Sequence, residues 1–158
     1  LCWFALLGLP GAALYRFADT ADSMWGYRGM YRGQCWEWAG KWAARADDAL
    51  AWLPARITGV ALLLAGAAGK LRQWPREAAQ TPSPNSGWPM AAMALALGVR
   101  LRKPGVYVLH AQGHAAQAQH IAQAVRLAAW AVLGLVAAWG GGWLLVLATR
   151  GWLAGAIA

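Results

Sequence analysis

The chain has 158 residues, of which 59% are hydrophobic and only 13% are charged. Soluble domains carry roughly 25% charged residues, so a lipid bilayer is the more suitable solvent for this chain. A formal net charge of +8 would point to nucleic acid in a soluble protein. Here the basic residues lie between apolar segments, as they do in the loops of membrane proteins, and we expect no nucleic-acid partner.

The apolar N-terminal segment, residues 1–14, is too short to cross a bilayer alone, since a span needs about 20 residues. The chain begins with Leu1 instead of Met, and we therefore expect a piece of a longer protein. Pro10 is expected to kink the first helix or to mark the start of a new one, because proline lacks the N–H donor that a helix interior needs.

Polar residues follow this segment. Asp19 and Asp22 would share one face of a helix, with Arg16 on the same side. The pattern allows two interpretations: an Arg–Asp pair on a solvated helix end, or a carboxylate pair that holds Mg²⁺ together with phosphate oxygens.

Residues 30–53 combine charge with several tryptophans, a composition typical of a membrane interface. Helical spacing is expected over residues 39–50, which places Arg45, Asp47 and Asp48 on one short stretch. These charges are interpreted either as a solvated helix face or as a second group of metal- or substrate-binding residues.

Two stretches approach the length of a membrane span. Residues 53–69 lie at the lower limit, with Pro54 in the first turn of a new helix and Arg56 near its end. Residues 127–149 form the clearest span, which the glycine triplet 140–142 would split into half-helices or a helical hairpin. If both flanking basic segments are cytoplasmic, the first stretch is a re-entrant or surface helix.

Residues 81–89 read Thr-Pro-Ser-Pro-Asn-Ser-Gly-Trp-Pro and cannot form a regular helix or strand, because three prolines fix φ and remove donors. We expect an ordered loop with a function, above an Ala- and Leu-rich helix at residues 90–101. The expected domain division is 1–105 for a membrane domain, 106–126 for a variable linker and 127–158 for a C-terminal transmembrane segment.

Four motifs stand in one order: GLPGAALYR at 8–16, DTADSMWGY at 19–27, ARADD with PAR at 44–56, and TPSPNSGWP at 81–89. Their order and spacing resemble the C-terminal half of the CobD/CbiB family of cobalamin-biosynthesis membrane proteins. With the apolar pattern, the resemblance implies an all-α, polytopic integral protein of the cell (inner) membrane. Short, partly re-entrant helices and the ordered Pro/Ser/Asn loop would build its site.

The resemblance also implies adenosylcobinamide-phosphate synthase activity. That enzyme uses ATP to join aminopropanol, or its O-phosphate, to adenosylcobyric acid through an amide bond. ATP and Mg²⁺ are then the expected cofactors. The expected partners are the corrinoid, the amino-alcohol phosphate, the bilayer and other corrinoid-pathway enzymes.

A site for this reaction needs metal ligands, cations that bind phosphate and groups that orient the reacting carboxylate. The candidates in this sequence are Asp22, Asp47, Asp48 and Asn85 for catalysis, Arg16, Arg45, Arg56, Ser83 and Ser86 for substrate and phosphate, and Asp19 with Asp22 for Mg²⁺.

The chain also departs from the family pattern. Asp19 stands where Asn is frequent, Ala51 where Asn often follows the Asp pair, and Met90 where Glu is common, while Arg102 and Lys103 replace a Gly pair. The alternative interpretation is a non-catalytic membrane paralogue that acts in sensing or in scaffolding a corrinoid-pathway complex.

Overall fold

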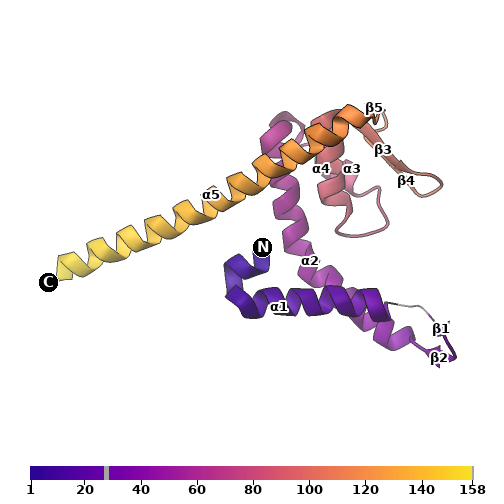
Figure 1. The fold of residues 1–158 in the computed structure, drawn as a ribbon, viewed down its shortest axis with the longest axis horizontal. Helices are drawn as coiled ribbons and strands as arrows, with labels where there is room; N and C mark the ends of the chain where they lie inside the picture. The colour runs from indigo at the N-terminus through magenta and orange to yellow at the C-terminus, as the bar shows by residue number, and fades with distance from the viewer. Residues whose placement is uncertain (27–28, 158) are drawn as a thin grey trace.

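The computed structural model describes residues 1–26 and 29–157, without the side chains of residue 39 and residues 146–157. Its helices are α1 (Cys2–Trp25), α2 (Glu37–Gly66), the short 3₁₀ helix η1 (Ala68–Lys70), α3 (Trp74–Ala78), α4 (Gly87–Leu97) and α5 (Ala118–Ile157). Its strands are β1 (Met30–Tyr31), β2 (Gln34–Cys35), β3 (Val99–Lys103), β4 (Tyr107–Leu109) and β5 (His114–Ala115). In Figure 1, α1 lies along one end of α2, and α3, α4 and the start of α5 gather at the other end.

Helix α1 is broken near its start, as expected from Pro10. The break itself is at Gly8, whose φ of 65° and ψ of −153° are not helical. Glycine reaches this region of positive φ without the steric cost of a Cβ atom. Pro10 then lies close to the start of the second, longer segment, where its missing donor costs least. The first segment turns away from the axis of the second (Figure 1).

Helix α2 is 30 residues long and contains Pro54 in its interior, so the expected helix start at Pro54 is wrong. In a regular helix the N–H of residue 54 would bond to the carbonyl of Leu50, and proline leaves that carbonyl without its donor. The Trp3 indole Nε1–H donates to the Leu50 carbonyl at 2.8 Å instead. The proline is therefore tolerated inside α2 because the folded-back start of α1 supplies the lost donor.

The apolar core lies where α2, α3, α4 and α5 meet. Its buried members are Leu62, Leu63, Trp74, Ala78, Ala91, Ala92, Leu95 and Ala131. Small residues let the helices approach closely: a Cβ atom at Gly59 would overlap the Trp74 ring, and one at Gly66 would lie 2.8 Å from Leu127. This core holds the segment between α3 and α4 beside α2.

The chain is mostly helical, as expected, but the described residues also form two small sheets, so the fold is not strictly all-α. Helix α4 begins at Gly87, so the expectation that residues 81–89 contain no helix is wrong for residues 87–89; Pro89 lies in the first turn, where a proline needs no N–H donor. The helix ends at Leu97 and not at residue 101, since Gly98 adopts a left-handed conformation with φ of 66°. The basic stretch that follows is strand β3, which pairs antiparallel with β4 and parallel with β5. Part of residues 106–126 is thus sheet, while the proposed division into domains stays a prediction.

Helix α5 runs without interruption through the glycine triplet, so the expected split at residues 140–142 is wrong. It crosses the upper part of α2 and then extends away from the rest of the chain (Figure 1). By length and composition, two helical stretches are apolar enough to cross a membrane: Gly40–Gly66 and Ala118–Leu145. Multiple crossings and re-entrant helices stay predictions.

Candidate functional site

Residues 81–89, here called the site loop, are joined to α2 by the side chain of Asn85. This amide is 6% exposed, the one buried polar side chain of the described core. Its Nδ2 donates to the main-chain carbonyl of Asp48 at 2.7 Å and to the Asp48 carboxylate at 3.3 Å. A buried amide is stable only when its donors and acceptor are satisfied, so Asn85 fixes the position of the loop against α2.

Arg56 completes the attachment two turns farther along α2. Its Nη1 donates to the Asn85 side-chain oxygen at 3.1 Å and to the Trp52 carbonyl at 2.8 Å. The guanidinium carbon lies 4.2 Å from the centre of the Trp52 ring and 4.6 Å from that of Trp88. Both distances fall within the range of cation–π attraction, so one arginine is held by two aromatic rings and one buried amide.

The loop is also held by its own side chains and by α3. The Ser83 hydroxyl accepts from the backbone N–H groups of Asn85 at 3.3 Å and Ser86 at 3.2 Å. The Thr81 hydroxyl donates to the Ser83 carbonyl at 3.0 Å. These local bonds replace the regular pairing that the prolines prevent, which is the usual chemistry of an ordered turn.

Two tryptophans also support the loop. Trp74 and Trp88 form an edge-to-face pair with ring centres 4.8 Å apart. The Trp88 indole donates to the Pro84 carbonyl at 3.1 Å, and the Trp74 indole donates to the Trp88 carbonyl at 2.7 Å. The residue pattern predicted no site role for Trp52, Trp74 or Trp88. Trp88 lies inside the loop motif, and this position was the available signal.

A second polar cluster lies between α1 and α2. The Asp47 carboxylate lies within electrostatic reach of Asp22, Asp19 and Asp48. Partial burial, with the negative charges of Asp47 and then Asp19, raises the pKa of the Tyr15 phenol on α1. The helices thus bring together carboxylates that are far apart in sequence.

One oxygen in this cluster has no partner. Across the described part of the chain, the buried Oδ1 of Asp47 finds no hydrogen-bond donor. A buried acceptor without a donor carries a desolvation cost, and a cation is one group that would remove it.

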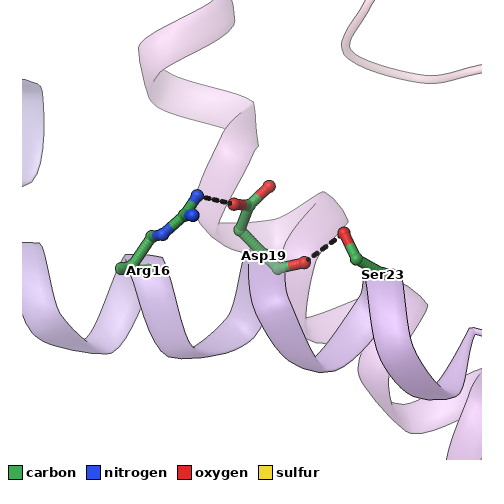
Figure 2. Close-up of polar contacts among 3 residues, drawn as sticks. All are labelled: Arg16, Asp19 and Ser23. Carbon is green, nitrogen blue, oxygen red and sulfur yellow. Dashed lines mark hydrogen bonds and ion pairs between the residues drawn. The ribbon is translucent and has the colours of Figure 1, made fainter.

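Arg16 and Asp19 form the ion pair that the simpler interpretation predicted. The Arg16 Nη1 lies 2.6 Å from Asp19 Oδ2, and both side chains are substantially exposed. The Ser23 hydroxyl donates to the Asp19 carbonyl at 2.9 Å. Figure 2 shows the three residues following one another along α1. An exposed pair of this kind contributes about 1 kcal/mol or less to stability.

Arg45 lies apart from both clusters. It lines a surface hollow of about 330 Å³ with Lys41, Trp38 and Trp42. The structure therefore joins Asp48, Arg56, Ser83 and Asn85 at the loop, with Ser86 exposed beside them, and gathers Asp19, Asp22 and Asp47 at the α1–α2 contact. The chemical roles of all these residues stay predictions.

The acidic cluster forms no complete metal cage. Within residues 1–26 and 29–145, no three His, Cys, Asp or Glu side chains are arranged to hold a metal ion. Mg²⁺ commonly takes only one or two carboxylates and completes its shell with water and substrate phosphate. The unpartnered Asp47 oxygen near Asp22 fits that incomplete type of site.

The family model described as "CobD/Cbib protein" matches residues 1–128. The chain is 44% identical over 161 aligned residues to the cobalamin biosynthesis protein CobD of Stutzerimonas stutzeri, which covers 97% of this chain and 49% of that protein. It is 51% identical over 113 residues to a probable cobalamin biosynthesis protein CobD of Methanothermobacter thermautotrophicus, covering 68% of this chain and 37% of that protein.

A third relative is the cobalamin biosynthesis protein CobD of Chromobacterium violaceum, 44% identical over 153 residues, 87% of this chain and 47% of that protein. The chain thus spans half or less of the length of these relatives. No solved structure matches it. The family match extends across α1 to α4, both attachment points of the site loop and the acidic cluster, and on that ground the chain belongs to the CobD/CbiB family.

Proposed function

We propose that the chain acts in cobalamin biosynthesis, as part of an ATP-dependent ligase that joins aminopropanol or its O-phosphate to adenosylcobyric acid. The relatives named for cobalamin biosynthesis support the pathway. The buried bonding of Asn85 to Asp48 and Arg56 is the observation that supports a built site at the loop. The two long apolar helices support a location in the inner membrane.

Amide formation from a carboxylate and an amine is unfavourable in water, so the acid must first be activated. ATP supplies this activation, as an acyl phosphate or an acyl adenylate, and the amine then displaces the phosphate-bearing leaving group. The contribution of this chain is to hold the reacting groups in position, which can account for much of a ligase's rate enhancement. A loop fixed by a buried amide suits that task.

The residues divide into two sets in this proposal. The rigid loop, with Asn85 held between Asp48 and Arg56, forms one wall and orients the corrinoid carboxylate or the amino-alcohol phosphate. The exposed Ser86 is the loop side chain that can reach a ligand. Asp22 and Asp47 would hold Mg²⁺, which would neutralise phosphate charge during transfer.

A direct assay tests the activity. The protein is expressed from its own gene with all flanking coding sequence, purified in detergent and supplied with adenosylcobyric acid, aminopropanol phosphate, ATP and Mg²⁺. We expect ATP consumption that depends on both other substrates, together with the amide product. Binding of the corrinoid without ATP consumption or product would contradict the ligase and favour the non-catalytic paralogue.

The Asp47→Asn variant tests the metal-binding role. We expect ligation to fall at least about a hundredfold, the loss that follows removal of a substantial electrostatic contribution. The folded state should be unchanged or slightly more stable, because the substitution removes one of several like charges near Asp22. Thermal unfolding in detergent and the ligation rate, measured on one preparation, separate the two effects.

Glu37→Gln is the matched control, since it makes the same acid-to-amide change at a carboxylate of α2 that pairs with Lys41 and lies outside the acidic cluster. Its activity should remain within a few-fold of the parent. An Asp47→Asn protein that is destabilised, or that keeps full activity, would contradict the metal-binding role.

A further inference from the structure

A groove of about 490 Å³ lies between α2 and α5. Its lining is apolar except for one residue, and its main members are Ile57, Val60 and Leu64 from α2, Trp130 and Gly134 from α5, and Arg56. The groove exists because small residues, Ala61 and Gly134 among them, stand where the two helices face each other. Its volume falls in the range of about 300–1,000 Å³ that is usual for small-molecule sites.

The two walls belong to the helices that are apolar enough to cross a membrane, Gly40–Gly66 and Ala118–Leu145. Several of the lining side chains are also substantially exposed, including Leu64 at 63% and Trp130 at 68%. In a bilayer these side chains would meet acyl chains. The groove would therefore be filled by hydrocarbon and not by water.

The α2 residues that line the groove run from Arg56 to Ala65. Arg56 is the first of them, so it lies at one end of the groove. Both hydrogen bonds of its side chain leave from Nη1, towards Asn85 and Trp52. Within the described part of the chain, Nη2 and Nε have no hydrogen-bond partner. A guanidinium with free donors at the end of an apolar groove is complementary to a phosphate that carries an acyl chain.

We propose that the α2–α5 groove binds one acyl chain of an anionic phospholipid, with the lipid phosphate at Arg56. The lipid phosphate would accept from Nη2 and Nε and so restrain the arginine whose Nη1 donates to Asn85, which would stabilise the site loop against α2. The lipid site shares Arg56 with the wall of the proposed ligase site, but lipid retention is measured without ligation and does not depend on that activity.

The test uses the protein expressed from its complete gene, stripped of lipid in detergent and titrated with phosphatidylglycerol or with diacylglycerol, which has identical acyl chains but no phosphate. Native mass spectrometry counts the lipids retained on each protein. We expect one phosphatidylglycerol to be retained, several-fold more strongly than diacylglycerol. Thermal unfolding should shift upward with phosphatidylglycerol alone.

Gly134→Leu is the decisive variant. Gly134 lines the groove and a Cβ atom there meets no other atom within 4 Å, so the larger side chain starts in open space and occupies part of the groove. Retention of phosphatidylglycerol should fall several-fold. Gly142→Leu is the matched control: its Cβ position is equally open, but it lies more than two turns farther along α5 and outside the groove.

Each remaining outcome overturns the proposal. Equal retention of the two lipids would exclude recognition by Arg56. Full retention by Gly134→Leu would place the lipid elsewhere. If the parent protein retains no lipid, another protein segment covers the groove.

Discussion

An Asn85→Asp substitution is expected to detach the site loop from α2. The change keeps the size of the side chain but replaces the donor Nδ2 with an oxygen. That oxygen would face the Asp48 carbonyl, 2.7 Å from the present nitrogen, and the Asp48 carboxylate at 3.3 Å. Two hydrogen bonds become repulsive contacts in a side chain that is only 6% exposed.

The expected cost is about 2–4 kcal/mol of unfolding free energy, since a buried acceptor loses its donor and a second negative charge is buried beside Asp48. The Arg56 guanidinium offsets part of this cost, because it already donates to the Asn85 oxygen. Thermal unfolding in detergent measures the stability. Growth of a synthase-deficient strain without added cobinamide measures the activity, which we expect to be lost.

Gln80→Glu provides the control, because it makes the same amide-to-carboxylate change just before the loop. The Gln80 amide donates to Glu77 at 3.2 Å on the exposed surface, where solvent screens the added charge. Its effect on stability should stay within about 1 kcal/mol, with activity retained. If the two substitutions had equal effects, the buried contact between Asn85 and α2 would not be what holds the loop.

A Gly87→Ala substitution is expected to be equally severe for a steric reason. Gly87 is the first residue of α4 and is buried. A Cβ atom there would overlap the Ala78 carbonyl oxygen at the end of α3 and the Thr81 hydroxyl at the start of the site loop. Because the Ala78 oxygen belongs to the backbone, no side-chain rotation relieves the overlap.

We expect a loss of about 3 kcal/mol or more, because α3 and α4 must move apart and the loop between them must change shape. The loss should appear in thermal unfolding and in the proteolytic sensitivity of the segment around residues 78–89. Strain-complementing activity should fall in parallel.

Gly69→Ala is the matched control, since a Cβ atom at Gly69 meets nothing within 4 Å. This variant should lie within about 0.5 kcal/mol of the parent. A Gly87→Ala protein with parental stability would show that α3 and α4 are not packed against each other at this point.

Several features were predictable because they depend on local sequence. Pro82 and Pro84 exclude regular structure from the first part of the stretch 81–89, but residues 87–89 form the first turn of α4, where Pro89 is tolerated. The three-residue spacing of Arg16 and Asp19 leads to an ion pair on any helix, and the pair is present at 2.6 Å. The order of the four motifs indicated the family, which the match over residues 1–128 confirms.

Other local signals were misleading. Either a contact with a distant residue or the helical residues on both sides outweighed the local preference of the sequence. Pro54 is a helix-start signal, yet α2 passes through it because Trp3 donates to the carbonyl that the proline leaves free. The glycine triplet 140–142 is a helix-breaking signal, yet α5 is continuous there. The end of α4 at Leu97 depended on Gly98, whose left-handed conformation ends the helix directly before β3.

Within the site, the sequence by itself determined which residue types were available: carboxylates in two clusters, arginines beside them and a rigid polar loop. Only the tertiary structure decided which of them meet. Adjacent Asp47 and Asp48 take part in different clusters, one at α1 and one at the site loop, because successive residues of a helix point about 100° apart. Arg56 meets Asn85, 29 positions away, because the core of α2, α3 and α4 holds the loop beside α2. Such pairings depend on packing between distant segments, which residue spacing along one helix does not encode.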